Sequence, residues 1–298
     1  IIACGLTCLE TAANPYTTVL GPPEYAERRI NFSQSFNGLG WIAGPLVGGI
    51  LIFSGSGGGN KFSTIALPYM LIGTLVLIVA IFFWRIKFPP VREEIEASAT
   101  DNSGSIRDLL KYPHFILAVV AQFLYVAAQT GVNSFFINYV TEELPALTNR
   151  QASLILAFGG MGLFWLGRFT GSTIFMRIIK PNRLLAFYAM ANVIMMALVV
   201  AGLGWTSVIA LFSTYFFMSV IFPTIFALGI KDLGPLTKRA SSFLVMAIVG
   251  GALIPLLMGY IADISSMAMG FIVPLVCFAF VFYYGLSGYK AGRTMQTA

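Results

Sequence analysis

The feature that most constrains this chain is a series of almost uncharged, apolar runs along its whole length. A helix of about 20 apolar residues spans the hydrocarbon core of a bilayer, which is roughly 30 Å thick. Of the 298 residues, 57% are hydrophobic and 10% are charged, whereas a soluble domain carries about 25% charged residues because its surface faces water. The runs are also longer than the roughly 10-residue alternating strands of a membrane barrel. The sequence therefore predicts an all-α integral membrane protein.

Nine membrane-spanning helices are expected from these runs. Their approximate bounds are 1–20, 30–53, 66–84, 113–139, 150–176, 184–203, 205–230, 240–262 and 268–288.

Lys and Arg residues are distributed unevenly between the connections of these spans. Fifteen of the 18 lie in alternate connections, and the 85–112 connection alone contains five of them together with five acidic residues. Short loops rich in Lys and Arg stay in the cytoplasm. We therefore expect a multi-pass protein of the inner (plasma) membrane, with residues 85–112 and the C-terminus in the cytoplasm. The net charge of +6 is then a topology signal, and no nucleic-acid partner is expected.

A weak internal repeat divides the chain. The pattern Pro-x4-Leu-Gly occurs at Pro15–Gly21 and again at Pro223–Gly229, and each copy precedes a basic loop and a helix that contains Ser-Phe. Carriers of the major facilitator type are built from parallel repeats, with the substrate site between them near the membrane midplane. If each repeat has six helices, the first visible span is the fourth of twelve, and we expect three helices before it. Residues 1–84 would then be helices four to six, 85–112 the linker, and 113–298 the C-terminal half with a short tail.

One carboxyl group lies deep inside a predicted span. Of the 12 acidic residues, only Glu10 is far from a loop or a span edge, about 15 Å from the span end near Leu20 at 1.5 Å per residue. Acidic residues in such places usually face an internal cavity and handle protons, ions or substrate, and desolvation favours the neutral form. We predict that Glu10 carries a coupling proton. The alternative is a structural carboxyl that is hydrogen-bonded to a neighbouring helix.

Amide side chains gather at a comparable depth on the next span. Asn37 lies about 10 Å inside that span, and Gln34, three residues earlier, shares its helix face. Asn14 lies four residues after Glu10, and Trp41 four residues after Asn37. These residues are predicted to bind hydroxyl groups and, for Trp41, to stack on a sugar ring. Amides at helix interfaces also serve simply to hold helices together, and that alternative stays open.

A second polar stripe is predicted in the other half. Tyr125, Gln129 and Asn133 are spaced four residues apart on one helix face. Sugars offer hydroxyl edges and apolar ring faces, so amides and aromatic rings suit their binding; ordinary interhelical packing is the alternative. Arg168, near the cytoplasmic end of its predicted span, is expected to be a gate or interface residue rather than a substrate ligand.

Several of these segments resemble the L-fucose:proton symporters of the major facilitator superfamily. The similar segments are Cys8–Pro15, Asn31–Asn37, Gly167–Gly171, Phe222–Lys231 and Ser241–Phe243. Together they extend over nearly the whole chain, and the first two are the most specific.

The resemblance implies a twelve-helix carrier that imports a monosaccharide together with a proton. By the pattern of that family, Glu10 is the proton-handling carboxyl, and Gln34 and Asn37 bind the sugar. The family also uses an acidic residue on its first helix, which this chain does not contain. The segment Tyr125–Thr130 is more similar to the fucose branch, so L-fucose is the expected sugar, with glucose or galactose as the alternative.

The remaining expectations concern chemistry and partners. The spans show no nucleophile–base pair, metal-ligand cluster or phosphate-binding loop, so neither an enzyme nor a metal site is expected. The three cysteines lie in apolar runs, which indicates no disulfide framework. No cofactor is expected apart from the proton as coupling ion, and the chain is expected to act as a monomer in the lipid bilayer. The competing hypothesis is a truncated, sensor-like membrane protein that does not transport.

Overall fold

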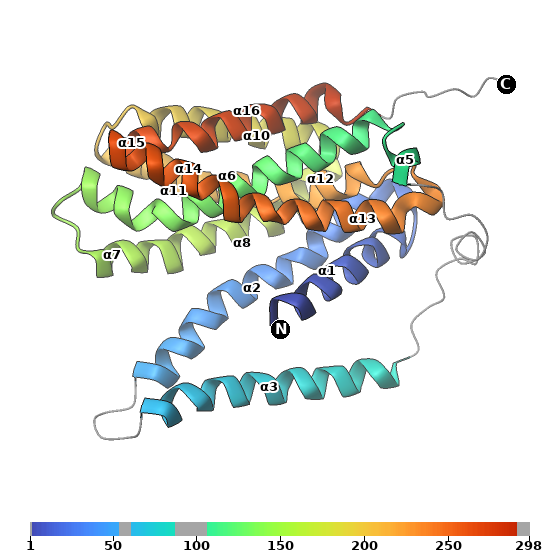
Figure 1. Ribbon diagram of the computed structural model, residues 1–298, viewed down its shortest axis with the longest axis horizontal. Helices are drawn as coiled ribbons and strands as arrows, with labels where there is room; N and C mark the ends of the chain where they lie inside the picture. The colour runs from blue at the N-terminus through green and yellow to red at the C-terminus, as the bar shows by residue number, and fades with distance from the viewer. Residues whose placement is uncertain (1, 54–60, 87–105, 291–298) are drawn as a thin grey trace.

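The computed structural model describes the backbone of residues 2–53, 61–86 and 106–290, and all the regular elements in these ranges are helices. Each of the nine predicted spans corresponds to helical structure within these ranges (Figure 1). The predicted linker, apart from its two ends, and the last eight residues lie outside the described residues.

The first helices are α1 (Ile2–Val19), α2 (Ala26–Phe53) and α3 (Lys61–Arg85), which we call the N-terminal helices. Residues 106–290, which we call the C-terminal bundle, begin with α5 (Ile106–Leu109) and α6 (Pro113–Glu143). Next comes a continuous helical rod, meaning a run of helical segments without a break. It consists of α7 (Asn149–Leu154), a π-helical segment, α8 (Met161–Thr170), a second π-helical segment and α9 (Met176–Ile178). It is followed by α10 (Pro181–Val200), α11 (Trp205–Met218), α12 (Ile221–Gly229), α13 (Thr237–Met246), α14 (Gly250–Ile264), α15 (Met267–Gly270) and α16 (Ile272–Tyr283).

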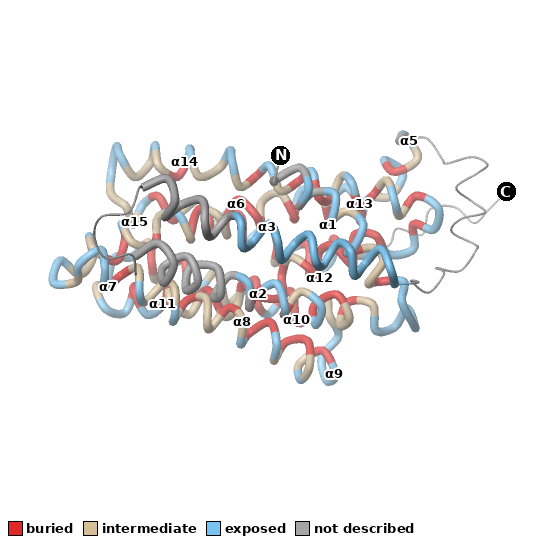
Figure 2. The backbone as a smooth tube through the Cα atoms, turned by 90° about the horizontal axis from the view of Figure 1, so that it is seen from below, coloured by how far each residue is buried: buried red, intermediate tan, exposed pale blue. Residues whose placement is uncertain are grey.

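Six helical rods among the described residues are long and apolar enough to cross a membrane. They are Pro113–Glu143, Asn149–Ile178, Pro181–Val200, Trp205–Gly229, Gly234–Ile264 and Met267–Gly288. The apolar side chains of α3 from Met70 onward are exposed, as Figure 2 shows by its pale colour. A surface of this kind is unfavourable in water and favourable against lipid tails, so the fold is that of a multi-pass membrane protein.

Local sequence signals explain where several helices begin. Proline occupies the first position of α6 and of α10, where its missing N–H group would have no helical partner. Before α7, the Thr148 hydroxyl accepts from the Gln151 backbone N–H at 3.3 Å, and the Gln151 side chain accepts from the Thr148 N–H at 2.9 Å. This reciprocal cap satisfies two N–H groups that the first helical turn leaves free.

The internal repeat is visible in the connections. A 3-10 turn, Pro23–Tyr25, joins α1 to α2, and another, Gly234–Leu236, lies between α12 and α13. In the first copy Arg29 donates to the backbone carbonyls of Thr17, Thr18 and Pro22, at 3.2, 2.5 and 2.7 Å. These bonds satisfy carbonyl groups at and just after the end of α1, so the α1–α2 hairpin is held by its own basic residue.

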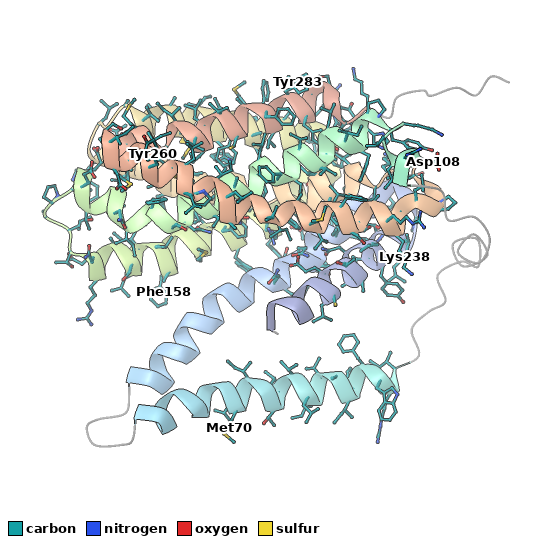
Figure 3. The ribbon with its side chains drawn as sticks, in the orientation of Figure 1. Met70, Asp108, Phe158, Lys238, Tyr260 and Tyr283 are labelled. Atoms are coloured by element: carbon teal, nitrogen blue, oxygen red, sulfur yellow. The ribbon has the colours of Figure 1, made fainter. Side chains whose placement is uncertain are left out.

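The N-terminal helices pack against the C-terminal bundle through α1 and α2. Helix α1 contacts α13, and α2 contacts both α8 and α12. These contacts lie toward the end of the bundle that carries α5, whereas α2 diverges from the bundle toward its far end (Figure 1). Figure 3 shows Lys238 toward the α5 end and Tyr260 toward the opposite end.

Candidate functional site

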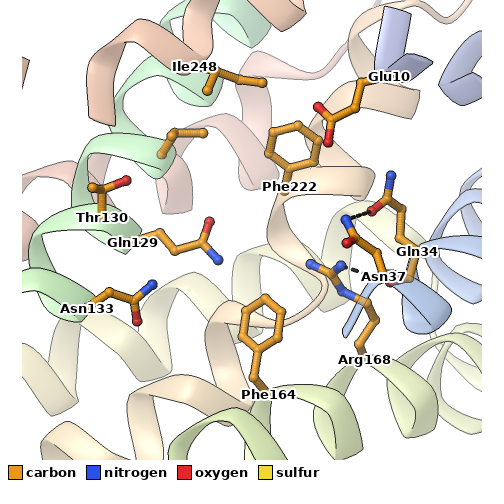
Figure 4. Close-up of a pocket in the computed structure, with 11 residues that line it drawn as sticks. Glu10, Gln34, Asn37, Gln129, Thr130, Asn133, Phe164, Arg168, Phe222 and Ile248 are labelled. Atoms are coloured by element: carbon orange, nitrogen blue, oxygen red, sulfur yellow. Dashed lines mark hydrogen bonds between the residues drawn. The ribbon is translucent and has the colours of Figure 1, made fainter. Parts of the chain in front are cut away.

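A cavity of about 220 Å³ lies between the N-terminal helices and the C-terminal bundle. Both sides contribute polar side chains to its wall, and aromatic and aliphatic groups complete it (Figure 4). It is lined by Glu10, Gln34, Asn37, Val126, Gln129, Thr130, Asn133, Phe164, Arg168, Phe222 and Ile248. Residues more than 100 positions apart in the sequence therefore line one polar cavity.

Glu10 is the only acidic residue among the described side chains that line this cavity. It is half-buried on α1, and its carboxyl group points toward the space enclosed by the other lining residues (Figure 4). No hydrogen bond or salt bridge from another described residue holds this carboxyl group. Among the described residues, the carboxyl group therefore faces the cavity without a hydrogen-bonding partner on a neighbouring helix.

The amides of the N-terminal helices form a chain of hydrogen bonds. The Asn37 side-chain N–H donates to the Gln34 amide oxygen at 3.2 Å, and the Gln34 N–H donates to the Asn14 amide oxygen at 2.8 Å. Asn14 is buried and does not line the cavity. It therefore supports Gln34 from behind, while Gln34 and Asn37 lie at the cavity wall. The side chain of Trp41, also predicted to bind sugar, lies outside the described residues.

Arg168 is buried and bridges the two sides of the cavity. Its Nε donates to the Ser219 carbonyl at 2.6 Å, and its Nη1 donates to the Gln34 carbonyl on α2 at 3.1 Å. The guanidinium also lies over the Phe164 ring, 4.7 Å from its centroid, a cation–π contact. Arg168 therefore contacts α2, and its guanidinium also lines the cavity.

Gly167 makes the Ser219 bond of Arg168 possible. A Cβ atom at this position would lie 2.5 Å from the Phe216 carbonyl oxygen and 2.6 Å from the Ser219 hydroxyl. Only glycine allows α8 and the end of α11 to approach this closely. This close approach brings Arg168 within hydrogen-bond distance of the Ser219 carbonyl.

Of the three residues in the predicted polar stripe on α6, only two line the cavity. Gln129 and Asn133 line the cavity, but Tyr125 does not; it is fully buried and donates to the Met218 carbonyl at 2.8 Å. Residues four apart on a helix are offset by about 40°, so a stripe of eight residues drifts by about 80°. Tyr125 therefore faces α11 while Asn133 faces the cavity.

Residues that the sequence did not single out complete the wall. Phe164 and Phe222 supply aromatic surface, and Thr130, Val126 and Ile248 supply smaller groups. Phe164 lies four residues before Arg168, and that spacing was the available signal. The position of Phe222 depends on how α12 packs, which no local pattern indicates.

Contacts between α2 and the C-terminal bundle close the structure on the α5 side of the cavity. Asn31 donates to the Thr224 hydroxyl at 3.0 Å, and Arg28 donates to the Ser172 carbonyl at 3.2 Å. The buried Glu27 carboxyl faces the Lys231 ammonium at 3.9 Å. All three bonds join α2 to segments that lie more than 100 residues later in the chain.

Comparison with known proteins identifies relatives along nearly the whole chain. Residues 1–247 match the family model of the Major Facilitator Superfamily. A glucose/galactose transporter of Brucella abortus is 35% identical over 98% of this chain and 70% of its own length. The L-fucose-proton symporter of Escherichia coli is 38% identical over 95% of this chain and 69% of its own length.

A solved structure has the same fold. The crystal structure of the E. coli fucose:proton symporter superposes with a TM-score of 0.85 at 36% identity, covering 95% of this chain and 74% of the other. A second structure of a transporter of this superfamily, described as being in the outward conformation, gives a TM-score of 0.84. With a family model over most of its length and relatives of this identity, the chain belongs to the major facilitator superfamily and, within it, to the fucose permease family.

Proposed function

We propose that this protein is a secondary transporter that imports a monosaccharide together with a proton, with L-fucose as the first candidate sugar. The observation that carries the proposal is the composition of the cavity wall. One carboxyl group, several amides and two aromatic rings surround a space between two sets of helices. Amides bind sugar hydroxyls and aromatic rings cover the apolar face of a sugar ring, while the carboxyl can hold or release a proton.

In the proposed mechanism, Glu10 couples proton binding to the movement of the helices. A charged carboxylate is costly in a low-dielectric cavity, and protonation removes that cost. The cavity can then close around its contents, so proton and sugar favour the same conformational change. The hydrogen bonds from Asn37 to Gln34 and from Gln34 to Asn14 fix the orientation of the Gln34 and Asn37 side chains. This pre-organises the two amides for a substrate.

Arg168 has a supporting role in this mechanism. Its guanidinium is bound to the Gln34 carbonyl, so a movement of α2 changes the surroundings of the arginine and of the cavity at the same time. We propose that this bond acts as a gate between the two sides. No step requires a cofactor other than the proton.

A second candidate substrate is glucose or galactose. The observation that favours it is the similarity to a glucose/galactose transporter, which extends over 98% of this chain. The similarity of Tyr125–Thr130 to the fucose branch is the reason for placing L-fucose first.

The proposed orientation places the basic end of the bundle in the cytoplasm of a bacterial-type inner membrane. Lys111, Lys231 and Lys238 lie in or beside connections at the α5 end. Loops rich in Lys and Arg stay on the cytoplasmic side. Since both sides of the cavity come from one chain, we propose that a monomer transports.

The proposal is tested by uptake of labelled sugars into proteoliposomes that contain the purified full-length gene product. The panel contains L-fucose, D-glucose and D-galactose, each with and without an inward proton gradient. We expect one of these sugars to accumulate only when the gradient is present, and a protonophore to abolish the accumulation. Uptake that is equal with and without the gradient would contradict proton coupling, and the absence of uptake of every monosaccharide would contradict the substrate class.

A further inference from the structure

A second, smaller recess adjoins the cavity inside the C-terminal bundle. It is lined by Gln129, Asn133, Met161, Phe164, Tyr215 and Met218. Gln129, Asn133 and Phe164 also line the main cavity, so the two spaces share a wall. The recess is too tight for a water molecule in this conformation.

Two polar atoms of the residues around this recess lack partners. The Tyr215 hydroxyl and the Asn133 amide oxygen are both buried, and neither has a hydrogen-bond partner among the described residues. Tyr215 as a whole is only 1% exposed. Buried polar groups in folded proteins are nearly always hydrogen-bonded, so a pair of this kind beside a cavity needs a physical reason.

The two atoms are chemically complementary to one hydroxyl group. A tyrosine hydroxyl can donate a hydrogen bond, and an amide oxygen can accept one. A sugar hydroxyl placed between them would accept from Tyr215 and donate to Asn133. Apart from Gln129, the rest of the recess is lined by Met161, Phe164 and Met218, so it offers such a hydroxyl few competing partners.

The side chains around the recess are of kinds that can make room. Met161 and Met218 are unbranched and flexible, and methionine adapts readily to irregular spaces. Phe164 lies in both walls and carries the guanidinium of Arg168 over its ring. A shift of Phe164 that opens the recess would therefore also change the cation–π contact with Arg168.

We propose that Tyr215 and Asn133 form a subsite for one hydroxyl group of the transported monosaccharide, which makes Tyr215 a substrate-contacting residue. The inference rests on the proposed function, since it concerns the same cavity. In this arrangement Gln34 and Asn37 hold one edge of the sugar, and the recess holds another. The sugar then bridges the N-terminal helices and the C-terminal bundle.

The test compares Tyr215→Phe with wild type in the purified full-length protein. The variant keeps the ring and its edge-on packing with Phe136, where the ring centroids are 5.7 Å apart. Calorimetry measures the affinity for the transported sugar and for its set of monodeoxy analogues, each lacking one hydroxyl. We expect Tyr215→Phe to bind the parent sugar roughly 5- to 100-fold more weakly.

One monodeoxy analogue should bind to wild type and to Tyr215→Phe with equal affinity, because this analogue lacks the hydroxyl that Tyr215 contacts. Asn133→Leu keeps the side-chain size. Its affinity for this same analogue should also equal that of wild type, while its affinity for the parent sugar should be weaker. The matched control is Tyr188→Phe: Tyr188 is also 1% exposed with an unpartnered hydroxyl, but it lines neither space. Its affinities should equal those of wild type.

Two outcomes would overturn the subsite while leaving the proposed function intact. One is an unchanged affinity of Tyr215→Phe for the parent sugar. The other is an equal loss for the parent and every analogue, which would show a packing effect. If wild type itself binds no monosaccharide, the proposed function fails and the subsite fails with it.

Discussion

At the scale of single residues, an acid and a base share one cavity without forming a salt bridge in the described structure. The donors of Arg168 reach the carbonyls of Ser219 and Gln34, and its charge lies over the Phe164 ring. A direct pair with Arg168 would hold Glu10 ionised. Because the guanidinium is bound elsewhere, the proposed proton exchange at Glu10 would not require such a pair to be broken.

Replacing Glu10 with glutamine tests this assignment. Glu10→Gln keeps the shape of the side chain but cannot release a proton. Accumulation of sugar driven by a pH gradient should be abolished, whereas exchange of labelled for unlabelled sugar should persist. Both are measured as isotope flux in proteoliposomes. Glu24→Gln, on the exposed 3-10 turn before α2, is the control and should accumulate sugar normally. Normal accumulation of sugar by Glu10→Gln would contradict the coupling role of Glu10 and would favour a structural role for its carboxyl group.

The amide pair gives a second residue-scale prediction. Gln34→Ala and Asn37→Ala should each weaken sugar binding roughly 5- to 150-fold, because each leaves a hydroxyl partner unpaired at a cost of about 1–3 kcal/mol. Ser33→Ala, on the exposed face of the same helix, should bind as wild type does. Calorimetry on folded protein separates this outcome from simple loss of stability. Equal affinities in all three variants would place the sugar site elsewhere.

The sequence indicated the polar half of this site better than its aromatic half. Glu10, Gln34 and Asn37 stand out because polar side chains are rare and costly inside apolar spans. Phe164 and Tyr215 do not stand out, because aromatic residues in spans mostly pack against other helices and a local pattern cannot distinguish the two cases. Which face of α6 meets the cavity also depends on helix drift, which is why Tyr125 lies outside it.

At the scale of helices, the structure extends the elements beyond the hydrophobic runs that predicted them. Helix α2 begins at Ala26 rather than near residue 30, and the rod that was expected from residue 240 begins at Gly234. Hydropathy marks only the part of a helix inside the hydrocarbon core, whereas the first polar turns lie in the interface. Those additional turns carry Glu27, Arg28 and Arg29, whose bonds hold α2 in place.

The bond between α2 and α12 gives an element-scale prediction. The Thr224 hydroxyl donates to the Val220 carbonyl and accepts from Asn31, so Thr224→Val removes this hydrogen bond between the helices, together with the bond inside α12, and keeps the side-chain shape. We expect the closure on the α5 side to open more often. The measurement is the rate of thiol labelling of Ser172→Cys in a background without the natural cysteines; Ser172 is fully buried in this conformation. Labelling should become several-fold faster.

Thr214→Val is the matched control for this experiment. Thr214 is equally buried and donates to the carbonyl four residues earlier, but its hydroxyl receives no bond from the described side chains of the N-terminal helices. Labelling of Ser172→Cys should be unchanged in this background. An equal acceleration in both backgrounds would mean that the hydroxyl acts on helix stability and not on closure.

At the scale of the whole molecule, two sets of helices meet on one side of a cavity and diverge on the other. The closing bonds lie at the end that carries the basic loops, and the proposed topology makes that end cytoplasmic. On that proposed topology, the structure would be an outward-facing state, with Glu10 and the amides accessible from outside. The internal repeat predicted that a site would lie between the two sets, but sequence alone could not indicate which end is closed, because closure depends on bonds between distant segments.

The proposed topology is checked by thiol labelling in intact cells. An impermeant reagent should label Ser56→Cys, in the connection expected outside, and should not label Ser98→Cys, in the connection expected in the cytoplasm. Permeabilised cells provide the control, in which both positions should react. Labelling of Ser98→Cys but not of Ser56→Cys in intact cells would invert the orientation.

The central claim is that sugar and proton move together, and it is tested most directly by recording external pH. Sugar is added to de-energised cells that express the full-length gene product, in a weakly buffered medium. The account predicts an immediate alkalinisation of the medium with the transported sugar, and none with Glu10→Gln. Entry of labelled sugar without any change in external pH would contradict proton coupling.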